Sequence, residues 1–412
     1  MVVPSGPRSR RHDVVRILCL TSRLPYPPDR GDRLRAFNFI KRLAGEHRLT
    51  LVSFVAAATE KAHLSALAPY CEAIHVLPLS PGRSAATALL NLWRPLPLQA
   101  LYYRSGAMDR LLGEITGSQR FDAAYIHLFR MAPYAARLRG LYRIVDLTDV
   151  ISKEVRRSLP YRRPVWRFIY RVEQPRIERY ERQVARTFEE VWLIAEAERL
   201  SLAAACPESN IQVVPNGVDL DLFRPDDGPT VPNSLIFVGH LRVPHNIDAA
   251  IQLATHVLPL VRDRVPDCTL AIVGADPAPA VLALASAPGV TVTGFVPDLN
   301  RRLNQASLFA APLRFAAGVQ NKVLEAMAAG RPVVTSSIVA EGLGGRPGED
   351  FLLADDPATM AAQIVALLGD ESRRQRIAQA GLQLVRERHS WDRVSQRMRD
   401  IAQALAGRGP GR

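Results

Sequence analysis

Short apolar segments alternate with segments of helical pattern along almost the whole of this 412-residue chain. VVRILCL near the beginning and LFAAPL and PVVTS in the second half are typical of buried strands, and a helix is expected over about 32–43. Strands that alternate with helices indicate parallel sheets. The length is enough for two domains, each with its own core. We therefore expect an α/β protein in which two doubly wound parallel-sheet domains face each other across a cleft.

A segment rich in Pro, Gly and Asp, IQVVPNGVDLDLFRPDDGPTVPN, divides the predicted strands into two series. We place the domain junction in this segment. The first Rossmann-like domain is expected over residues 14–205 and the second over 211–388. The terminal segment SWDRVSQRMRDIAQALA predicts one amphipathic helix, over 390–406.

The segment 317–336, AGVQNKVLEAMAAGRPVVTS, carries the clearest chemical signal. It predicts a helix between two strands, and Gly330 is expected to end that helix. A helix N-terminus presents free N–H groups and a partial positive charge, which suit a phosphate. Lys322 would add a full charge, and Glu325 could accept hydroxyl donors, so the pattern indicates a nucleotide or nucleotide-sugar pocket.

An ordinary surface ion pair is the alternative interpretation of Lys322 and Glu325. Apolar and small residues surround Glu325 in VLEAMAAG. Acids are rarely buried without a partner or a ligand, so the pattern favours a ligand.

Composition excludes several classes of protein. No apolar run approaches the roughly 20 residues that a membrane span requires, and the basic start MVVPSGPRSRRHDVV lacks the apolar core of a secretory signal. The four cysteines have no CxxC spacing, which argues against a disulfide framework or a zinc site. We expect a reduced, cytoplasmic setting.

The net charge of +13 calls for an anionic partner. Residues 151–190 carry eleven Lys and Arg against six acids, interleaved with aromatic residues. Such a segment can lie on an anionic membrane with its aromatic rings among the headgroups. No nucleic-acid-binding motif accompanies the charge, so we expect no nucleic-acid partner. A solvated helix whose aromatic residues pack inward is the alternative to membrane contact.

Several motifs in a fixed order point to a known family. With VVPNGVD, FVGHLR, VTGFVPDL and NKVLEAMAAGRPVV, the second half resembles family 4 glycosyltransferases of the GT-B fold. TSRLPYPPDRGDRLRAFNFIKRLA, VDLTDV and the basic segment extend the likeness into the first half. Together they look like the sugar transferases associated with exosortase and PEP-CTERM exopolysaccharide systems. The resemblance covers roughly residues 17–391.

The resemblance implies that the second domain holds a nucleotide-sugar donor, the first domain holds the acceptor, and the final helix crosses back to the first domain. It also implies a transfer that retains anomeric configuration and needs neither a metal nor another cofactor. We expect a hexosyltransferase that extends a lipid-linked exopolysaccharide acceptor at the cytoplasmic face of an anionic membrane. A non-catalytic nucleotide-binding scaffold and a sugar-nucleotide epimerase of the same fold are the alternatives.

The resemblance assigns roles to the residues around the predicted helix. Glu325 stands where the family binds the nucleotide ribose, and a carboxylate can accept two hydroxyl donors. Asn321 and Lys322 would approach the diphosphate or the sugar. The family has a sugar-binding glutamate where this chain has Ala317. Either Gln320 and Asn321 take over its contacts, or the sugar is handled differently.

The motif FVGHLRVPHNIDAA departs from the family at two positions. His240 and His245 stand where the family has Arg and Lys, which bring positive charge to the diphosphate. A neutral histidine offers only a hydrogen bond, although a nearby diphosphate could raise its pKa. We place Gly239, His240 and Arg242 in the donor site, with Arg242 and Lys322 as substitute charges. Whether the two histidines are functional or ordinary loop residues stays open.

Two residues of the first half complete the predicted site. Gly31 lies in PPDRGD, where the family has a glycine loop near the diphosphate and acceptor, and glycine permits close backbone approach. His127, after FDAAYI, matches a family histidine that faces the cleft and could donate to the sugar or polarise the acceptor. A turn glycine and a core histidine are the alternative interpretations.

Two further features of the second half lead to different expectations, one for a binding role and one for a structural role. Val296 is expected, from the resemblance alone, to lend its backbone to the base. Asp219 and Asp221 superficially resemble a metal-binding DxD motif, but their place in VVPNGVDLDLF favours a structural role in the linker.

Overall fold

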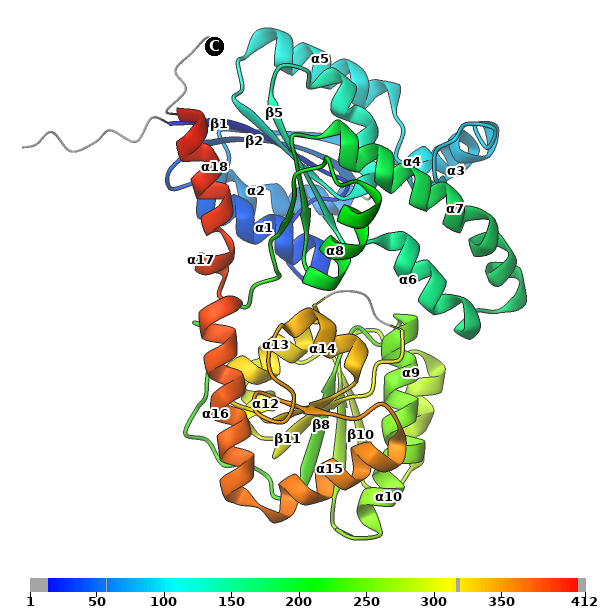
Figure 1. Cartoon of the computed structure of the whole chain (residues 1–412), viewed down its shortest axis with the longest axis vertical. Coiled ribbons are helices and arrows are strands. Elements are labelled where there is room, and N and C mark those ends of the chain that lie inside the picture. Colours follow the sequence, from blue (N-terminus) through cyan, green and yellow to red (C-terminus); the bar gives the residue numbers. More distant parts are fainter. Residues whose placement is uncertain (1–13, 57, 316–318, 407–412) are drawn as a thin grey trace, which may run out of the picture.

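The computed structural model describes residues 14–56, 58–315 and 319–406, and these form two parallel sheets, one above the other in Figure 1. The first sheet has seven strands in the order β3-β2-β1-β4-β5-β6-β7, and the second has six in the order β10-β9-β8-β11-β12-β13. Strands β4, β8 and β11 are buried along their whole length, as expected of parallel sheets covered by helices on both faces. The prediction of two doubly wound parallel-sheet domains is confirmed.

The first sheet consists of β1 (Arg16–Thr21), β2 (Arg48–Val55), β3 (Ala73–Pro78), β4 (Ala123–His127), β5 (Tyr142–Thr148), β6 (Glu190–Leu193) and β7 (Ile211–Val213). Its helices are α1 (Gly31–Leu43), α2 (Leu64–Leu67), α3 (Pro81–Leu90), α4 (Leu98–Tyr102), α5 (Gly106–Ser118), α6 (Ile151–Ser158), α7 (Pro164–Thr187) and α8 (Glu196–Ala205). A 3₁₀ segment, η3 (Phe129–Arg137), follows β4.

The second sheet consists of β8 (Ser234–Val238), β9 (Thr269–Val273), β10 (Val290–Gly294), β11 (Leu308–Ala311), β12 (Val333–Thr335) and β13 (Leu352–Leu353). Its helices are α9 (Pro244–Gln252), α10 (Leu258–Arg262), α11 (Pro279–Leu282), α12 (Leu299–Asn304), α13 (Asn321–Ala328), α14 (Ser337–Leu343), α15 (Pro357–Gly369) and α16 (Glu371–Arg388). Among the helices described in either domain, none combines the length and apolar composition that a membrane span requires.

The first sheet extends beyond the predicted domain boundary. The predicted second domain starts at residue 211, yet Ile211–Val213 pairs in parallel with β6 as the edge strand of the first sheet. The short apolar run IQVV adjoins the Pro- and Gly-rich linker, and only the pairing with β6 shows to which sheet it belongs. The second sheet begins at Ser234.

The last described residues lie on the first domain (Figure 1), in two helices rather than the single predicted one, α17 (Trp391–Val394) and α18 (Gln396–Ala406). Between them, the buried Ser395 donates its hydroxyl to the carbonyl of Trp391, a bond that disturbs helix geometry. Trp391 packs so closely on the linker that a Cβ on Gly217 would lie 2.5 Å from its ring. Arg397 then forms an ion pair with Glu190 of β6 at 2.7 Å.

Side chains bridge the two domains on the side of α6. Arg157 of α6 forms an ion pair with Glu341 of α14 at 2.8 Å. Tyr161, between α6 and α7, stacks on Phe315 of the second domain with ring centroids 4.6 Å apart. These contacts and the final helices fix how the C-terminal ends of the two sheets face each other.

Candidate active site

The beginning of α13 faces the first domain. Gln320 precedes the helix, and among the described residues no side chain caps it. The N–H groups of Val323 and Leu324 donate to the Gln320 carbonyl, so those of Asn321 and Lys322 are the ones open to a ligand. A Cβ placed on Gly31 would lie 3.8 Å from Asn321 Nδ2, which brings the beginnings of α1 and α13 together. Asn321 Oδ1 is buried and has no hydrogen-bond partner among the described residues. Gly31 and Asn321, both predicted to belong to the site, therefore meet across the domain boundary.

Lys322 and Glu325 lie one turn apart at this end of α13, and both are half-buried. Lys322 Nζ donates to Gln320 Oε1 at 3.0 Å. Burial lowers the pKa of Lys322 to about 8, against the attraction of Glu325. Burial likewise raises the pKa of Glu325 to about 7, against the attraction of Lys322. Both charges are thus weakly stabilised near neutral pH, and a bound anion with hydroxyl donors would stabilise them.

His245, in the first turn of α9, does not supply the positive charge that the family's lysine would bring. Burial, together with the nearby cations Lys322 and Arg162, lowers the pKa of His245 to about 3. The ring is therefore neutral at neutral pH and offers a hydrogen bond only. Arg162 belongs to the first domain, so cations from both domains meet near His245, which suits an anion.

The loop after β8 is shaped by close packing. A Cβ on Gly239 would approach Asn246 Cγ to 2.8 Å, and a Cβ on Gly274 would lie 1.7 Å from the Gly239 carbonyl oxygen. Asn246 Nδ2 donates to the carbonyl of His240 at 3.0 Å. This packing explains why residue 239 is a glycine, and it holds the loop against the beginning of α9. That Gly239 belongs to the donor site stays a prediction.

Two of the other predicted donor residues, His240 and Arg242, lie in this loop, and Val296 follows β10. His240 Nε2 is 3.4 Å from Asp276 Oδ2. Arg242 is exposed. Val296 packs against the hydrophobic core of the second domain. The adjacent Phe295 is 74% exposed. The roles of Arg242 and Val296 in donor binding also stay predictions.

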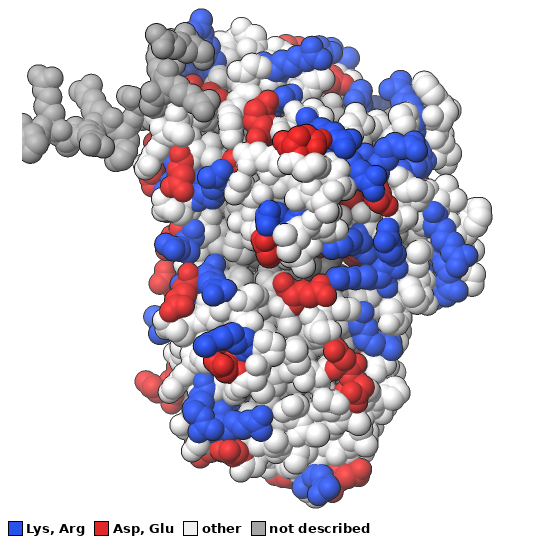
Figure 2. Space-filling model, in the orientation of Figure 1, with Lys and Arg blue, Asp and Glu red and all other residues white. Residues whose placement is uncertain are grey.

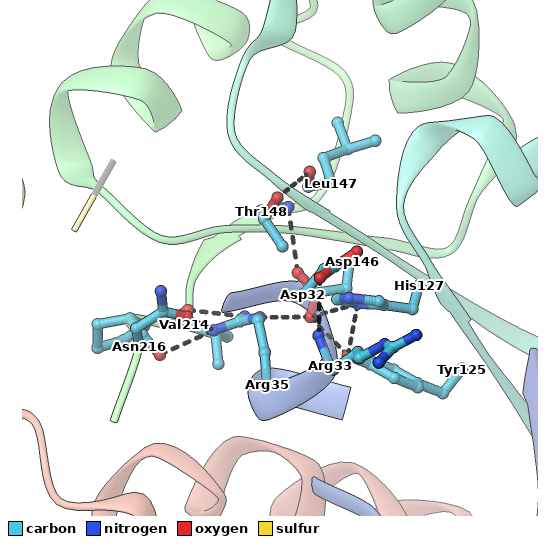
Figure 3. Close-up of polar contacts among 11 residues, drawn as sticks. Asp32, Arg33, Arg35, Tyr125, His127, Asp146, Leu147, Thr148, Val214 and Asn216 are labelled. Atoms are coloured by element: carbon cyan, nitrogen blue, oxygen red, sulfur yellow. Dashed lines mark hydrogen bonds and ion pairs between the residues drawn. The ribbon is translucent and has the colours of Figure 1, made fainter. Parts of the chain in front are cut away.

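His127, at the end of β4, belongs to a buried polar network (Figure 3). Its Nδ1 lies 3.2 Å from Tyr125 Oη and 3.7 Å from Asp146 Oδ2. Asp146 also accepts hydrogen bonds from Tyr125 Oη and Arg35 Nε, both at 2.6 Å. His127 Nε2 is buried and has no hydrogen-bond partner among the described residues, so it can bind a ligand group.

Arg35 joins this network to the linker between the domains. Its guanidinium donates to the carbonyls of Val214 and Pro215 and to Asn216 Oδ1, at 2.9 to 3.0 Å. Burial alone would raise the pKa of Asp146, but Arg35 and His127 outweigh it and hold that pKa well below its usual range. A charged Asp146 therefore fixes both His127 and, through Arg35, the linker.

The structure thus places the predicted residues in two groups. Gly31 and His127 lie in the first domain, and the eight others lie in the second: Gly239, His240, Arg242, Val296, Gln320, Asn321, Lys322 and Glu325. Ala317 lies outside the described residues. Sequence reasoning missed the Tyr125–Asp146–Arg35 network, although the acid of VDLTDV at the end of an apolar strand was a usable signal.

The DLD motif has a structural explanation. Asp219 Oδ1 accepts the backbone N–H groups of Asp221 and Leu222 at 3.1 and 3.2 Å. Among the residues that the structure describes, no group of three or more His, Cys, Asp or Glu side chains is placed to hold a metal ion.

Comparison with known proteins identifies the second domain. Residues 232–370 match the family described as Glycosyl transferases group 1. HepE of Anabaena, solved in complex with UDP and glucose, shares the fold of the whole chain, with a TM-score of 0.65, 15% identity, and coverage of 94% of this chain and 99% of that one. The two sheets therefore form a GT-B fold.

Two relatives each match about half of this chain. Phosphatidyl-myo-inositol mannosyltransferase of Mycobacterium leprae is 28% identical over 206 residues, which are 48% of this chain and 54% of that one. D-inositol 3-phosphate glycosyltransferase of Xylanimonas cellulosilytica is 29% identical over 243 residues, 53% of this chain and 57% of that one. The chain spans about half the length of each relative. These matches support the glycosyltransferase assignment of the domain, while the exosortase and PEP-CTERM association stays a prediction.

Proposed function

We propose that this protein is a retaining, metal-independent glycosyltransferase that moves a sugar from a nucleotide-sugar donor to a growing, lipid-linked exopolysaccharide acceptor. The observation that carries the proposal is the beginning of α13, which no described side chain caps, where Lys322 and Glu325 follow Asn321 and Asn321 approaches Gly31 of the first domain. The match to glycosyl transferases group 1 and the UDP bound by HepE support a nucleotide-sugar donor. The resemblance of the motifs supports the acceptor class and the retained configuration.

In such a transfer we assign a task to each of these side chains. The N–H groups of α13 and Lys322 bind the diphosphate, whose negative charge grows as its bond to the sugar breaks. Glu325, as a carboxylate, accepts the two ribose hydroxyls. From the first domain, His127 Nε2 forms a hydrogen bond with the sugar or the acceptor. The departing phosphate oxygen takes the acceptor's proton, so the protein's main work is electrostatic.

Binding of the nucleotide sugar is expected to be tightest between about pH 7 and 8, which calorimetric titration of the protein with its nucleotide sugar from pH 5.5 to 9.5 would measure. As pH falls through about 7, Glu325 takes a proton and stops accepting two hydroxyls. As pH rises through about 8, Lys322 loses its charge. The diphosphate of a nucleotide sugar has no ionisable group in this range, so the profile reports the protein.

Two variants show which residue causes each decline in binding at the two ends of this pH profile. Glu325→Gln should remove the decline on the acid side, and Lys322→Met should remove the decline on the alkaline side. A profile that is flat in the wild type, or that neither variant alters, would contradict the assigned roles.

We also propose that the protein binds the cytoplasmic face of an anionic membrane through α7 and the end of α3. Large apolar side chains are exposed on both segments: Leu89, Leu90, Leu92, Trp93, Val165, Trp166, Phe168 and Val172. Arg176 of α7 donates to the carbonyls of Leu92, Arg94 and Leu96, which holds the two segments together. Lys and Arg side chains gather over α6 and α7 (Figure 2), so apolar and cationic groups share this face.

The inward-packing alternative applies to Tyr180, which is buried in the core of the first domain. Tyr161 stacks on Phe315 but stays 47% exposed. Trp166 and Phe168 remain 53% and 71% exposed, and they carry the membrane proposal.

Sedimentation with anionic vesicles should be strong at low salt and weaken as salt rises, because each arginine near the surface contributes roughly 1 kcal/mol that salt screens. The double variant Trp166→Ser/Phe168→Ser should reduce sedimentation several-fold. Leu282→Ser, at a residue 52% exposed on the second domain, is the matched control and should change nothing. Equal sedimentation with neutral and anionic vesicles would reject the electrostatic part of the proposal.

A further inference from the structure

A cavity of about 520 Å³ lies in the first domain, beside the candidate active site. It is bounded by the residues that follow β1, by the ends of β2 and β3, and by α4 and η3. Its polar side is formed by Ser22, Arg23 and Arg130, and its apolar side includes Phe54, Leu98 and Tyr102. None of these residues has a role in the donor site described above.

The polar side of the cavity carries more positive than negative charge. Arg130 Nη2 and Arg23 Nη1 lie 3.3 and 3.7 Å from the same oxygen of Asp32. Burial works against ionisation of Asp32, but Arg130, Arg23 and His127 outweigh it and lower the pKa of that carboxyl. The other nearby acid, Glu60, is held by Arg33 at 2.6 Å and also attracts Arg23, and Arg33 has a second partner in Asp29. Arg23 and Arg130 share Asp32 at longer distances, and none of the described residues that line the cavity is an acid.

Neutral contacts fix Arg130 without balancing its charge. Arg130 Nε donates to Ser22 Oγ at 2.9 Å, and its guanidinium lies 5.1 Å from the ring centroid of Tyr103. Half-buried cations are stabilised by an anion, and two adjacent guanidiniums suit a phosphate, which each can bind through two N–H groups. The polar side of the cavity is therefore built for an anionic group.

The part of the cavity lined by Phe54, Leu98 and Tyr102 suits an apolar group. Tyr102 contacts Tyr103, the ring on which Arg130 packs, edge to face at 5.4 Å. The lining of this part is mainly apolar, so an alkyl chain or the apolar face of a ring would lose water there without leaving many polar groups unpaired. A ligand that satisfies both sides joins an anion to an apolar group.

The cavity also adjoins the place where the two domains meet. Asp32 directly follows Gly31, the residue that approaches Asn321 of α13. His127 is close enough to Asp32 to influence its ionisation. A ligand held by Arg23 and Arg130 would therefore lie on the acceptor side of the reacting groups.

We propose that this cavity binds the sugar acceptor, and that the acceptor carries a phosphate beside an apolar group, with the phosphate between Arg23 and Arg130. The inference rests on the proposed transferase function and names the chemical class of its acceptor. A phosphate of this kind can belong to a lipid carrier or to a small phosphorylated sugar, and binding measurements separate the two sources.

Calorimetric titration of the full chain with octyl phosphate, octyl glucoside and inorganic phosphate tests the proposal without any turnover. Octyl phosphate should bind at least about tenfold more tightly than either other probe, because it alone occupies both sides of the cavity. Saturating UDP should leave this binding in place, since UDP would occupy the second domain. If inorganic phosphate bound as tightly as octyl phosphate, the result would favour a small phosphorylated acceptor and would overturn the apolar part of the proposal.

Three variants locate the binding. Arg23→Gln should weaken the binding of octyl phosphate roughly tenfold, because it removes a charge-assisted hydrogen bond to the phosphate. The affinity for octyl glucoside should change by less than about twofold. Tyr102→Ala should weaken the binding of octyl phosphate and of octyl glucoside, and it should not change the binding of inorganic phosphate. Arg139→Gln, at an exposed arginine of the same domain, is the matched control.

Arg23 is only partly buried, so its variant should fold, and thermal unfolding checks this. Unchanged octyl phosphate affinity in Arg23→Gln, displacement by UDP, or no binding to the wild type would each overturn the proposal. A protein that binds octyl phosphate as expected but transfers no sugar would instead contradict the proposed function.

Discussion

Lys322→Met is expected to lower kcat for sugar transfer by roughly 10²–10³-fold, the loss typical when one group that stabilises developing negative charge is removed. Methionine keeps the length of the side chain and removes its charge. Lys322 is the cation on α13 beside the uncapped helix beginning, and His245 is neutral there. Steady-state kinetics with the protein's own donor would measure the effect.

Lys61→Met, at an exposed lysine of the first domain, is the matched control and should leave kcat unchanged. Because Lys322 also attracts the charge of Glu325, its removal should raise the pKa of Glu325 further. A decrease in kcat of less than threefold in a folded Lys322→Met protein would show that the leaving group is stabilised elsewhere.

Arg35→Met is expected to reduce the free energy of unfolding by about 3–5 kcal/mol, because it leaves the buried charge of Asp146 without its partner. Arg35 is 1% exposed and Asp146 is fully buried. The variant also leaves the carbonyls of Val214 and Pro215 without their donor. Urea denaturation followed by circular dichroism would measure the change.

Two comparisons isolate the ion pair from the rest of the substitution. Lys41→Met on the same helix, at an exposed position, should change stability by less than about 0.5 kcal/mol. The double variant Arg35→Met/Asp146→Asn should regain part of the loss, because no unpaired charge remains buried. A loss below about 1 kcal/mol in Arg35→Met would mean that the network does not stabilise the fold.

The fold could be predicted because both faces of a parallel sheet are buried. Strands such as VVRILCL and LFAAPL are apolar along their length and alternate with helices, which leaves few other architectures. What the sequence did not reveal is which sheet a three-residue edge strand joins. Ile211–Val213 needed its pairing with β6 to be placed.

The site was predictable where its residues are neighbours in sequence. Gln320 to Glu325 form one helix beginning, and the apolar and small residues around Glu325 are enough to indicate that its carboxylate is shielded from water. Arg35 and Asp146, by contrast, are 111 positions apart, and only the fold brings them to 2.6 Å.

The charge state of His245 was equally inaccessible from the sequence. Its neutrality depends on burial and on Arg162 from the other domain. Residue type and local spacing carry neither piece of information.

Central to the proposed mechanism is that the beginning of α13 holds the diphosphate of a nucleotide sugar during transfer. The most direct test measures nucleoside diphosphate released from a panel of sugar nucleotides by the wild type, Glu325→Ala and Lys322→Met, with a membrane lipid extract as the source of acceptor. We predict release from at least one donor, stimulated by the extract and lost in both variants. No release from any donor, or full release in both variants, would contradict this mechanism.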